Sequence, residues 1–230
     1  MTQTTDLLRS TRLDNGLRVV TERNPSQRSA SVTWLVPGGS ACDPLDRGDG
    51  WGTILSEFLL RGAGDFDSRA FSDALDRLGM RRSVTADTYH QHVNATMAGG
   101  ELIAGLDRLV DLVRRPRFPE AALDAVRSLC LQELAGVEDD PASYAGIRLD
   151  EIRFPSPFNR HGLGVKEHLE AATHADLQAH WDDVARPEGS ILAVAGDVDH
   201  DRVIELLEAR CADWHGTGPT PEPTGVAAGG

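Results

Sequence analysis

The sequence predicts an α+β fold, in which helices pack against an antiparallel or mixed β-sheet. Segments rich in Val and Thr, in which apolar and polar residues alternate, are typical of strands and occur in two separate parts of the chain. Longer segments with apolar residues at helical spacing lie between and after them. The strict alternation of strand and helix that marks a parallel α/β sheet is absent from this order.

Five strands are expected, and the first two are predicted to pair with each other. The clearest alternation places Val32, Trp34 and Val36 on one face of an extended segment. An Asp-Asn-Gly turn signal precedes the first strand, and a Gly-Gly pair ends the second. The expected strands lie at residues 16–22 and 29–37, at two adjacent segments within 80–97 that turn near 86–87, and at 190–195.

Helices are expected wherever apolar residues recur at a spacing of three or four. Ser68 is the predicted N-cap of the second helix, Pro119 fits the first turn of the fourth, and Thr173 with Asp176 resembles a capping box. The expected helices lie at residues 51–61, 68–78, 101–114, 119–134, 142–152, 173–184 and 201–212. Residues 1–214 are predicted to form one domain, and residues 215–230, which are rich in Pro, Gly and Thr, a linker or tail.

Composition excludes several classes of protein. The 230 residues carry a formal net charge of −13, which argues against binding a nucleic-acid backbone or an anionic membrane. No apolar run approaches the length of a membrane span, and residues 1–10 lack the apolar core of a signal peptide. The three cysteines, Cys42, Cys130 and Cys211, are widely separated, so neither a disulfide framework nor a cysteine zinc site is predicted. Cys130 is expected in the core, and the chain in a reducing cytoplasm.

Short strings in a shared order extend from about residue 10 to residue 214. They are NGLRVV at 15–20, GGS at 38–40, LLRGA at 59–63, PRFP at 116–119, EDDP at 138–141 and LAVAGD at 192–197. In content and order these strings resemble the amino-terminal domain of the insulinase/pitrilysin family of zinc peptidases, which includes the mitochondrial processing peptidase. The resemblance implies an α+β peptidase half, one of two such halves that enclose a chamber.

The same resemblance implies that the family's zinc site has decayed in this chain. Active members carry His-x-x-Glu-His on a helix, where the two His bind zinc and the Glu activates the metal-bound water. Thr53, Ser56 and Glu57 occupy those three positions here, so both His ligands and the general base are replaced. Glu133 lies 76 residues after Glu57, at the family's distance for the third ligand. We therefore expect no catalytic residue and no zinc cofactor.

Two further features bear on ligands. In active relatives an extended substrate adds to a sheet edge, and Arg82, Ser83 and Val84 correspond to that strand here. His90 and His92 would share one strand face and are a second candidate metal pair, although such a pair is more often a packed or solvated face.

Three functions remain open from the sequence. The leading interpretation is a non-catalytic peptidase-family domain or subunit that pairs with a second half, or with an active relative, to enclose and bind a peptide. The first alternative is a zinc endopeptidase with unusual metal ligands. Residual metal binding is a separate question, in which the carboxylates of Glu57 and Glu133 with the Thr53 hydroxyl would suit a weakly bound hard cation. The second alternative is a stand-alone peptide-binding or scaffold module.

Overall fold

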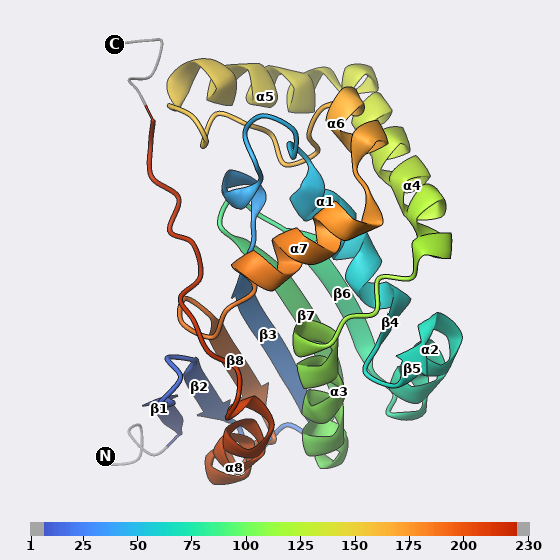
Figure 1. Cartoon of the computed structure of the whole chain (residues 1–230). Coiled ribbons are helices and arrows are strands. Elements are labelled where there is room, and N and C mark those ends of the chain that lie inside the picture. The colour runs from blue at the N-terminus through green and yellow to red at the C-terminus, as the bar shows by residue number, and fades with distance from the viewer. Residues whose placement is uncertain (1–6, 225–230) are drawn as a thin grey trace.

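A six-stranded mixed sheet lies at the centre of the structure, with its strands in the order β1-β2-β8-β3-β7-β6 (Figure 1). The structure is a computed structural model and describes residues 7–224. The strands are β1 (Leu8–Arg12), β2 (Arg18–Arg23), β3 (Ser29–Pro37), β6 (Arg81–Ala86), β7 (His90–Ala98) and β8 (Ile191–Gly196). β2 and β8 run parallel, whereas every other neighbouring pair in this sheet is antiparallel. A second, two-stranded ladder joins β4 (Gly62–Ala63) to β5 (Phe66–Asp67).

Helices α1, α3, α7 and α8 cross the face of the sheet that is turned toward the viewer in Figure 1, while α5 lies across the top and α4 runs along the right-hand side. The helices are α1 (Trp51–Phe58), α2 (Ser68–Arg77), α3 (Leu102–Arg114), α4 (Leu123–Gly136), α5 (Pro141–Arg153), α6 (Lys166–Ala171), α7 (His174–Val184) and α8 (His200–Cys211). None of these helices, all within residues 7–224, is both long and apolar enough to cross a membrane. The predicted α+β class is therefore confirmed.

The predicted pairing of the first two strands is wrong. β8 lies between β2 and β3, pairing in parallel with β2 and antiparallel with β3. The sequence of β8 is ILAVAG, without a charged side chain, and such a strand is stabilised at the centre of a sheet, where both of its edges are paired. Sequence periodicity locates a strand but carries no information on which partner, near or far in the chain, lies beside it.

Several boundaries also differ from expectation. The N-cap of α2 is Asp67 rather than Ser68, since the Asp67 carboxylate accepts a hydrogen bond of 2.8 Å from the Ala70 amide. The capping role of Thr173 at α7 is confirmed, because its hydroxyl accepts a hydrogen bond from the Asp176 amide at 3.2 Å. Strands β1, β4 and β5 and helix α6 were not predicted, because each is too short to show a period.

A single apolar core fills the space between the sheet and the helices. Its largest fully buried side chains include Trp34 of β3, Phe58 of α1, Trp181 of α7, and Phe118 in the segment before α4. The rings of Phe58 and Phe118 lie 5.0 Å apart between their centroids, so α1 is held against the segment that leads into α4. Cys130, at 1% exposure, belongs to this core as predicted.

His200, the first residue of α8, connects that helix to the outer strands of the sheet. Its Nδ1 lies 2.8 Å from the Thr21 hydroxyl, and its Nε2 lies 2.9 Å from the Thr11 hydroxyl. Burial disfavours the charged imidazolium and lowers the pKa of His200, an effect that the nearby Arg9 guanidinium reinforces and the carboxylates of Asp201 and Asp199 oppose.

Lowering the pH from 7 to 5 is therefore expected to reduce the free energy of unfolding through His200. The unfolded chain binds a proton at the ordinary histidine pKa of about 6.5, whereas the folded chain binds it at a lower pH, so protons favour unfolding in this window. In His200→Gln the difference in stability between pH 7 and pH 5, measured by urea unfolding, should be smaller than in the wild type. An identical difference in both proteins would contradict this assignment.

Candidate functional site

The amino end of α1 is held in place by a buried carboxylate. Asp43 accepts hydrogen bonds from the amides of Gly50, at 3.2 Å, and Gly52, at 3.0 Å. Nε2 of His180, on α7, lies 3.4 Å from the same carboxylate, and both side chains are almost completely buried. Gly50 adopts a φ of +98°, a left-handed conformation that glycine allows without strain. These contacts give α1 a defined position against α7.

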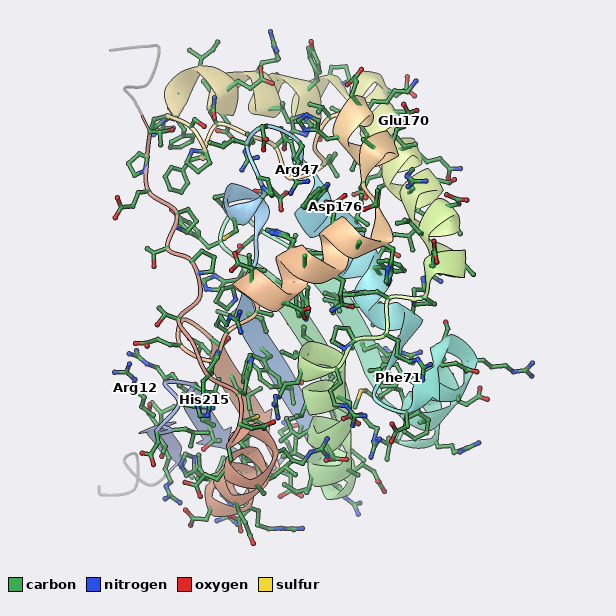
Figure 2. All side chains as sticks on the ribbon, viewed as in Figure 1. Arg12, Arg47, Phe71, Glu170, Asp176 and His215 are labelled. Atoms are coloured by element: carbon green, nitrogen blue, oxygen red, sulfur yellow. The ribbon has the colours of Figure 1, made fainter. Side chains whose placement is uncertain are left out.

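A second contact between the same regions lies at the surface. Arg47, in the loop before α1, and Asp176 of α7 point toward one another in Figure 2, and their charged groups are 3.0 Å apart. The guanidinium of Arg47 also lies over the ring of Trp51, 5.5 Å from its centroid. The loop before α1 is thus fastened to α7 at both a buried and an exposed point.

The three positions of α1 that the sequence aligned with the zinc motif are engaged in other contacts. The Thr53 hydroxyl donates a hydrogen bond of 2.6 Å to the carbonyl of Gly162, in the loop between α5 and α6. The Ser56 hydroxyl donates to the carbonyl of Thr53 at 2.8 Å, one turn back along the helix. The Glu57 carboxylate lies 3.7 Å from the guanidinium of Arg61, also one turn away. The hydroxyls of Thr53 and Ser56 are therefore hydrogen-bonded within the protein, whereas the partly exposed Glu57 carboxylate has only a loose ion pair.

Glu133 lies on α4, which packs against α1. Burial, reinforced by the nearby carboxylates of Glu57 and Glu133, raises the pKa of the Cys130 thiol to about 12. Glu133 is exposed and lines a cavity together with His161 from the loop that precedes α6. The structure thus brings Glu57 and Glu133, far apart in sequence, to the same region of the fold.

These side chains do not fit a zinc ion. Zinc in proteins takes imidazole, thiolate or carboxylate ligands, usually four in a tetrahedral shell. In the described part of the chain, no three His, Cys, Asp or Glu side chains gather closely enough to hold a metal. The hydroxyl of Thr53 donates a hydrogen bond to a backbone carbonyl, and the carboxylate of Glu57 faces Arg61.

The segment that was aligned with the substrate strand lies at an edge of the main sheet. Arg82, Ser83 and Val84 are in β6, which pairs with β7 on one side and ends the strand order on the other. The amide of Asp87 donates a hydrogen bond of 2.9 Å to the carbonyl of His90. Because hydrogen-bonded and non-bonded residue pairs alternate along an antiparallel hairpin, this bond determines which residues of β6 bond to β7. It follows that Ser83 bonds to β7, while the backbone groups of Arg82 and Val84 point to the open edge.

The histidine pair of β7 is not assembled into a metal site. Nε2 of His92 lies 2.6 Å from the carboxylate of Asp87, and that carboxylate also accepts hydrogen bonds from the amides of Tyr89 and His90. These bonds lower the pKa of Asp87 despite its partial burial, and the neighbouring His92 contributes to the same effect. The side chains of Asp87 and His92 therefore stabilise the turn between β6 and β7.

Sequence reasoning missed the residues that surround α1. Asp43, His180 and Gly162 each contact this helix or its first turn, from three different parts of the chain. Asp43 lies in an Asp- and Gly-rich loop, seven residues before Gly50 at the start of α1. The sequence therefore offered one signal, an acidic side chain close enough to accept hydrogen bonds from the first amides of the helix. The roles of His180 and Gly162 depend on tertiary contacts and leave no local pattern.

Comparisons with known proteins agree on one family. The profile described as Insulinase (Peptidase family M16) matches residues 18–154. An uncharacterized zinc protease of Mycobacterium leprae is 29% identical over 225 residues, which cover 96% of this chain and 50% of that protein. A probable mitochondrial-processing peptidase subunit beta of Arabidopsis thaliana is 26% identical over 201 residues, covering 87% of this chain and 38% of that protein.

A solved structure shares the fold over nearly the whole chain. The domain described as a peptidase M16 inactive domain from Pseudomonas fluorescens superposes with a TM-score of 0.84 at 16% identity. The match covers 94% of this chain and 54% of that one. The chain spans about half the length of the curated relatives it matches, or less.

Proposed function

Because the chain belongs to the insulinase family of peptidases, family M16, we propose that it is a non-catalytic member of that family. In this proposal it pairs with a second peptidase-like half, or with an active relative, and the two enclose and bind a peptide. The observation that carries the proposal is the set of residues that α1 presents at the positions of the zinc motif. In this proposal Thr53, Ser56 and Glu57 align with the two ligands and the base of a zinc peptidase. The hydroxyls of Thr53 and Ser56 are hydrogen-bonded to backbone carbonyls, and the Glu57 carboxylate lies 3.7 Å from the Arg61 guanidinium.

Pairing is supported by the lengths of the relatives. The matched zinc protease and processing-peptidase subunit are each about twice as long as this chain, or longer, and their remaining length is enough for another domain of this size. The Pseudomonas fluorescens domain is itself described as inactive. A domain that keeps the fold and loses the metal ligands retains the surfaces needed for assembly and for holding a substrate.

Peptide binding is supported by the open edge of β6. An extended peptide that adds to this edge would accept a hydrogen bond from the Arg82 amide and would place alternate side chains on the two faces of the sheet. Binding of this kind needs backbone groups rather than a metal, so it survives the loss of the zinc ligands.

The test is a comparison of two variants at a single edge position. Arg82→Pro removes the outward amide, and Arg82→Ala keeps it while removing the same contacts of the side chain with Asp76 and Ser72. Fluorescein-labelled insulin B chain is the extended peptide probe. We expect Arg82→Pro to bind it roughly 3- to 10-fold more weakly than Arg82→Ala, the effect of one hydrogen bond.

The same samples decide between the proposal and catalysis. Mass spectrometry should find the insulin B chain intact after incubation with the purified chain. Stoichiometric zinc together with cleavage, both lost in Glu133→Ala, would instead show a zinc endopeptidase with unusual ligands. Equal affinities of the two Arg82 variants would remove β6 as the binding strand.

A further inference from the structure

Helix α5 covers the top of the molecule but contributes nothing to the core. None of its described side chains is buried along the whole length Pro141–Arg153. Leu149 and Ile152 are each 58% exposed, and Tyr144 and Phe154 are also exposed. Soluble monomers rarely expose several large apolar side chains on one element, and such an element commonly marks a contact with another protein.

The apolar side chains of α5 lie on two adjacent sides of the helix. Tyr144 and Ile147 face a groove of about 670 Å³ that α4, α5 and α6 enclose, with Leu131 and Leu134 on its α4 wall. Leu149 and Ile152, at helical spacing, form a stripe beside it that continues into Phe154. We call the groove and this stripe the α5 surface; it is wide enough to receive more than one side chain of a partner.

Charge on the α5 surface is cancelled locally. At the groove, Arg148 pairs with Glu151 at 2.5 Å, and Lys166 pairs with Glu170 at 3.8 Å. Glu170 of α6, labelled in Figure 2, is one of the residues that line the groove. The chain as a whole carries a net charge of −13, so most of its surface repels another acidic protein. The α5 surface lacks this repulsion, so a partner protein would be recognised there by apolar contacts.

The carboxyl-terminal segment leads to the same place. It leaves α8 and runs along one side of the molecule up to the carboxyl end of α5 (Figure 1). There the Thr224 amide donates a hydrogen bond of 2.6 Å to the carbonyl of Ser156, two residues after the exposed Phe154. Relatives continue for about as long again, so a following half would begin beside the apolar stripe.

We propose that the α5 surface is the docking site for the second peptidase-like half, a partner that presents an apolar surface here. This assignment rests on the pairing proposed above and names the surface through which it occurs. Three observations converge on one occupant: the unburied apolar residues of α5, the local cancellation of charge, and the end of the carboxyl-terminal segment beside Phe154.

The experiment measures the affinity of the purified chain for a purified second peptidase-like half from the same organism, by analytical ultracentrifugation. Leu149→Asp and Ile152→Asp, singly and together, should raise the dissociation constant, by at least 10-fold in the double variant. Leu8→Asp is the matched control, because Leu8 is also 58% exposed but lies on β1, at the opposite end of the molecule. It adds the same charge and should change the constant by less than 2-fold.

Leu149→Met keeps an apolar side chain and should retain wild-type affinity, and circular dichroism of each variant should show an unchanged fold. If the double variant binds the second half as tightly as the wild type, the α5 surface is not the docking site, although pairing stands. If the wild-type chain forms no complex, the pairing itself fails and this assignment with it. If the variants weaken binding of the insulin B chain but not of the second half, the surface belongs to the peptide, and the assignment is overturned.

Discussion

Replacing Thr53 by His, Ser56 by Glu and Glu57 by His is expected to create a zinc site with a dissociation constant of roughly 1 µM or tighter, corresponding to about −8 kcal/mol. The triple variant would place two imidazoles at positions i and i+4 of α1, with the Glu133 carboxylate on the neighbouring helix α4 as a third ligand. The wild-type chain should show no comparable binding, because the hydroxyl of Thr53 is bonded to Gly162 and Glu57 faces Arg61. Isothermal titration calorimetry measures both proteins.

The control for this prediction adds Glu133→Ala to the triple variant. Affinity should then fall by at least 10-fold, since one of three protein ligands is removed. A folded triple variant that releases no heat with zinc would refute the placement of Thr53, Ser56, Glu57 and Glu133 on the four family positions. The outcome therefore tests the proposed ancestry of the site independently of any peptide.

Trp181→Ala should reduce the free energy of unfolding by about 3–5 kcal/mol, the largest stability effect that we expect from one substitution. Trp181 is 1% exposed, on the side of α7 that faces the core. Its ring packs edge-on against Phe118, with 6.4 Å between centroids, and its Nε1 donates a hydrogen bond of 3.0 Å to the carbonyl of Val113. The Ala variant loses this packing and leaves that carbonyl without its partner.

Trp181→Phe separates the two contributions, because it keeps an aromatic ring in the core and removes the indole donor. Its cost should be smaller, about 1–2 kcal/mol, since it reflects mainly the lost hydrogen bond. Urea unfolding followed by circular dichroism gives both values, with unchanged dependence on denaturant. Equal destabilisation in the two variants would mean that the hydrogen bond, rather than ring packing, dominates.

Local pattern was sufficient to predict most elements of this fold. The alternation of Val32, Trp34 and Val36 identified β3 with its observed bounds, and helical spacing located seven of the eight α-helices within residues 7–224. The partner of β2 was not predictable in this way. Strand order depends on which apolar strand is inserted at the centre of the sheet, and β8 lies about 170 residues further along the chain.

The sequence could predict which positions form the candidate site, but not the contacts that their side chains make. The spacing of Glu57 and Glu133 follows from the resemblance to the family, and the structure brings both near Cys130. The bond from Thr53 to Gly162 could not be foreseen, because Gly162 belongs to a loop whose course is set by tertiary packing. The exposure of α5 was equally hidden, since its apolar residues are compatible with a buried helix.

The insertion of β8 between β2 and β3 has a consequence for how the chain folds. β2 and β3 lie within the first 40 residues, yet neither gains its second neighbour until residue 196 is available. Contacts between such distant segments are slow to form, because the entropy of closing the intervening loop is lost before the contacts compensate for it. During synthesis β2 and β3 therefore each keep one unpaired edge until β8, in the last part of the domain, has left the ribosome.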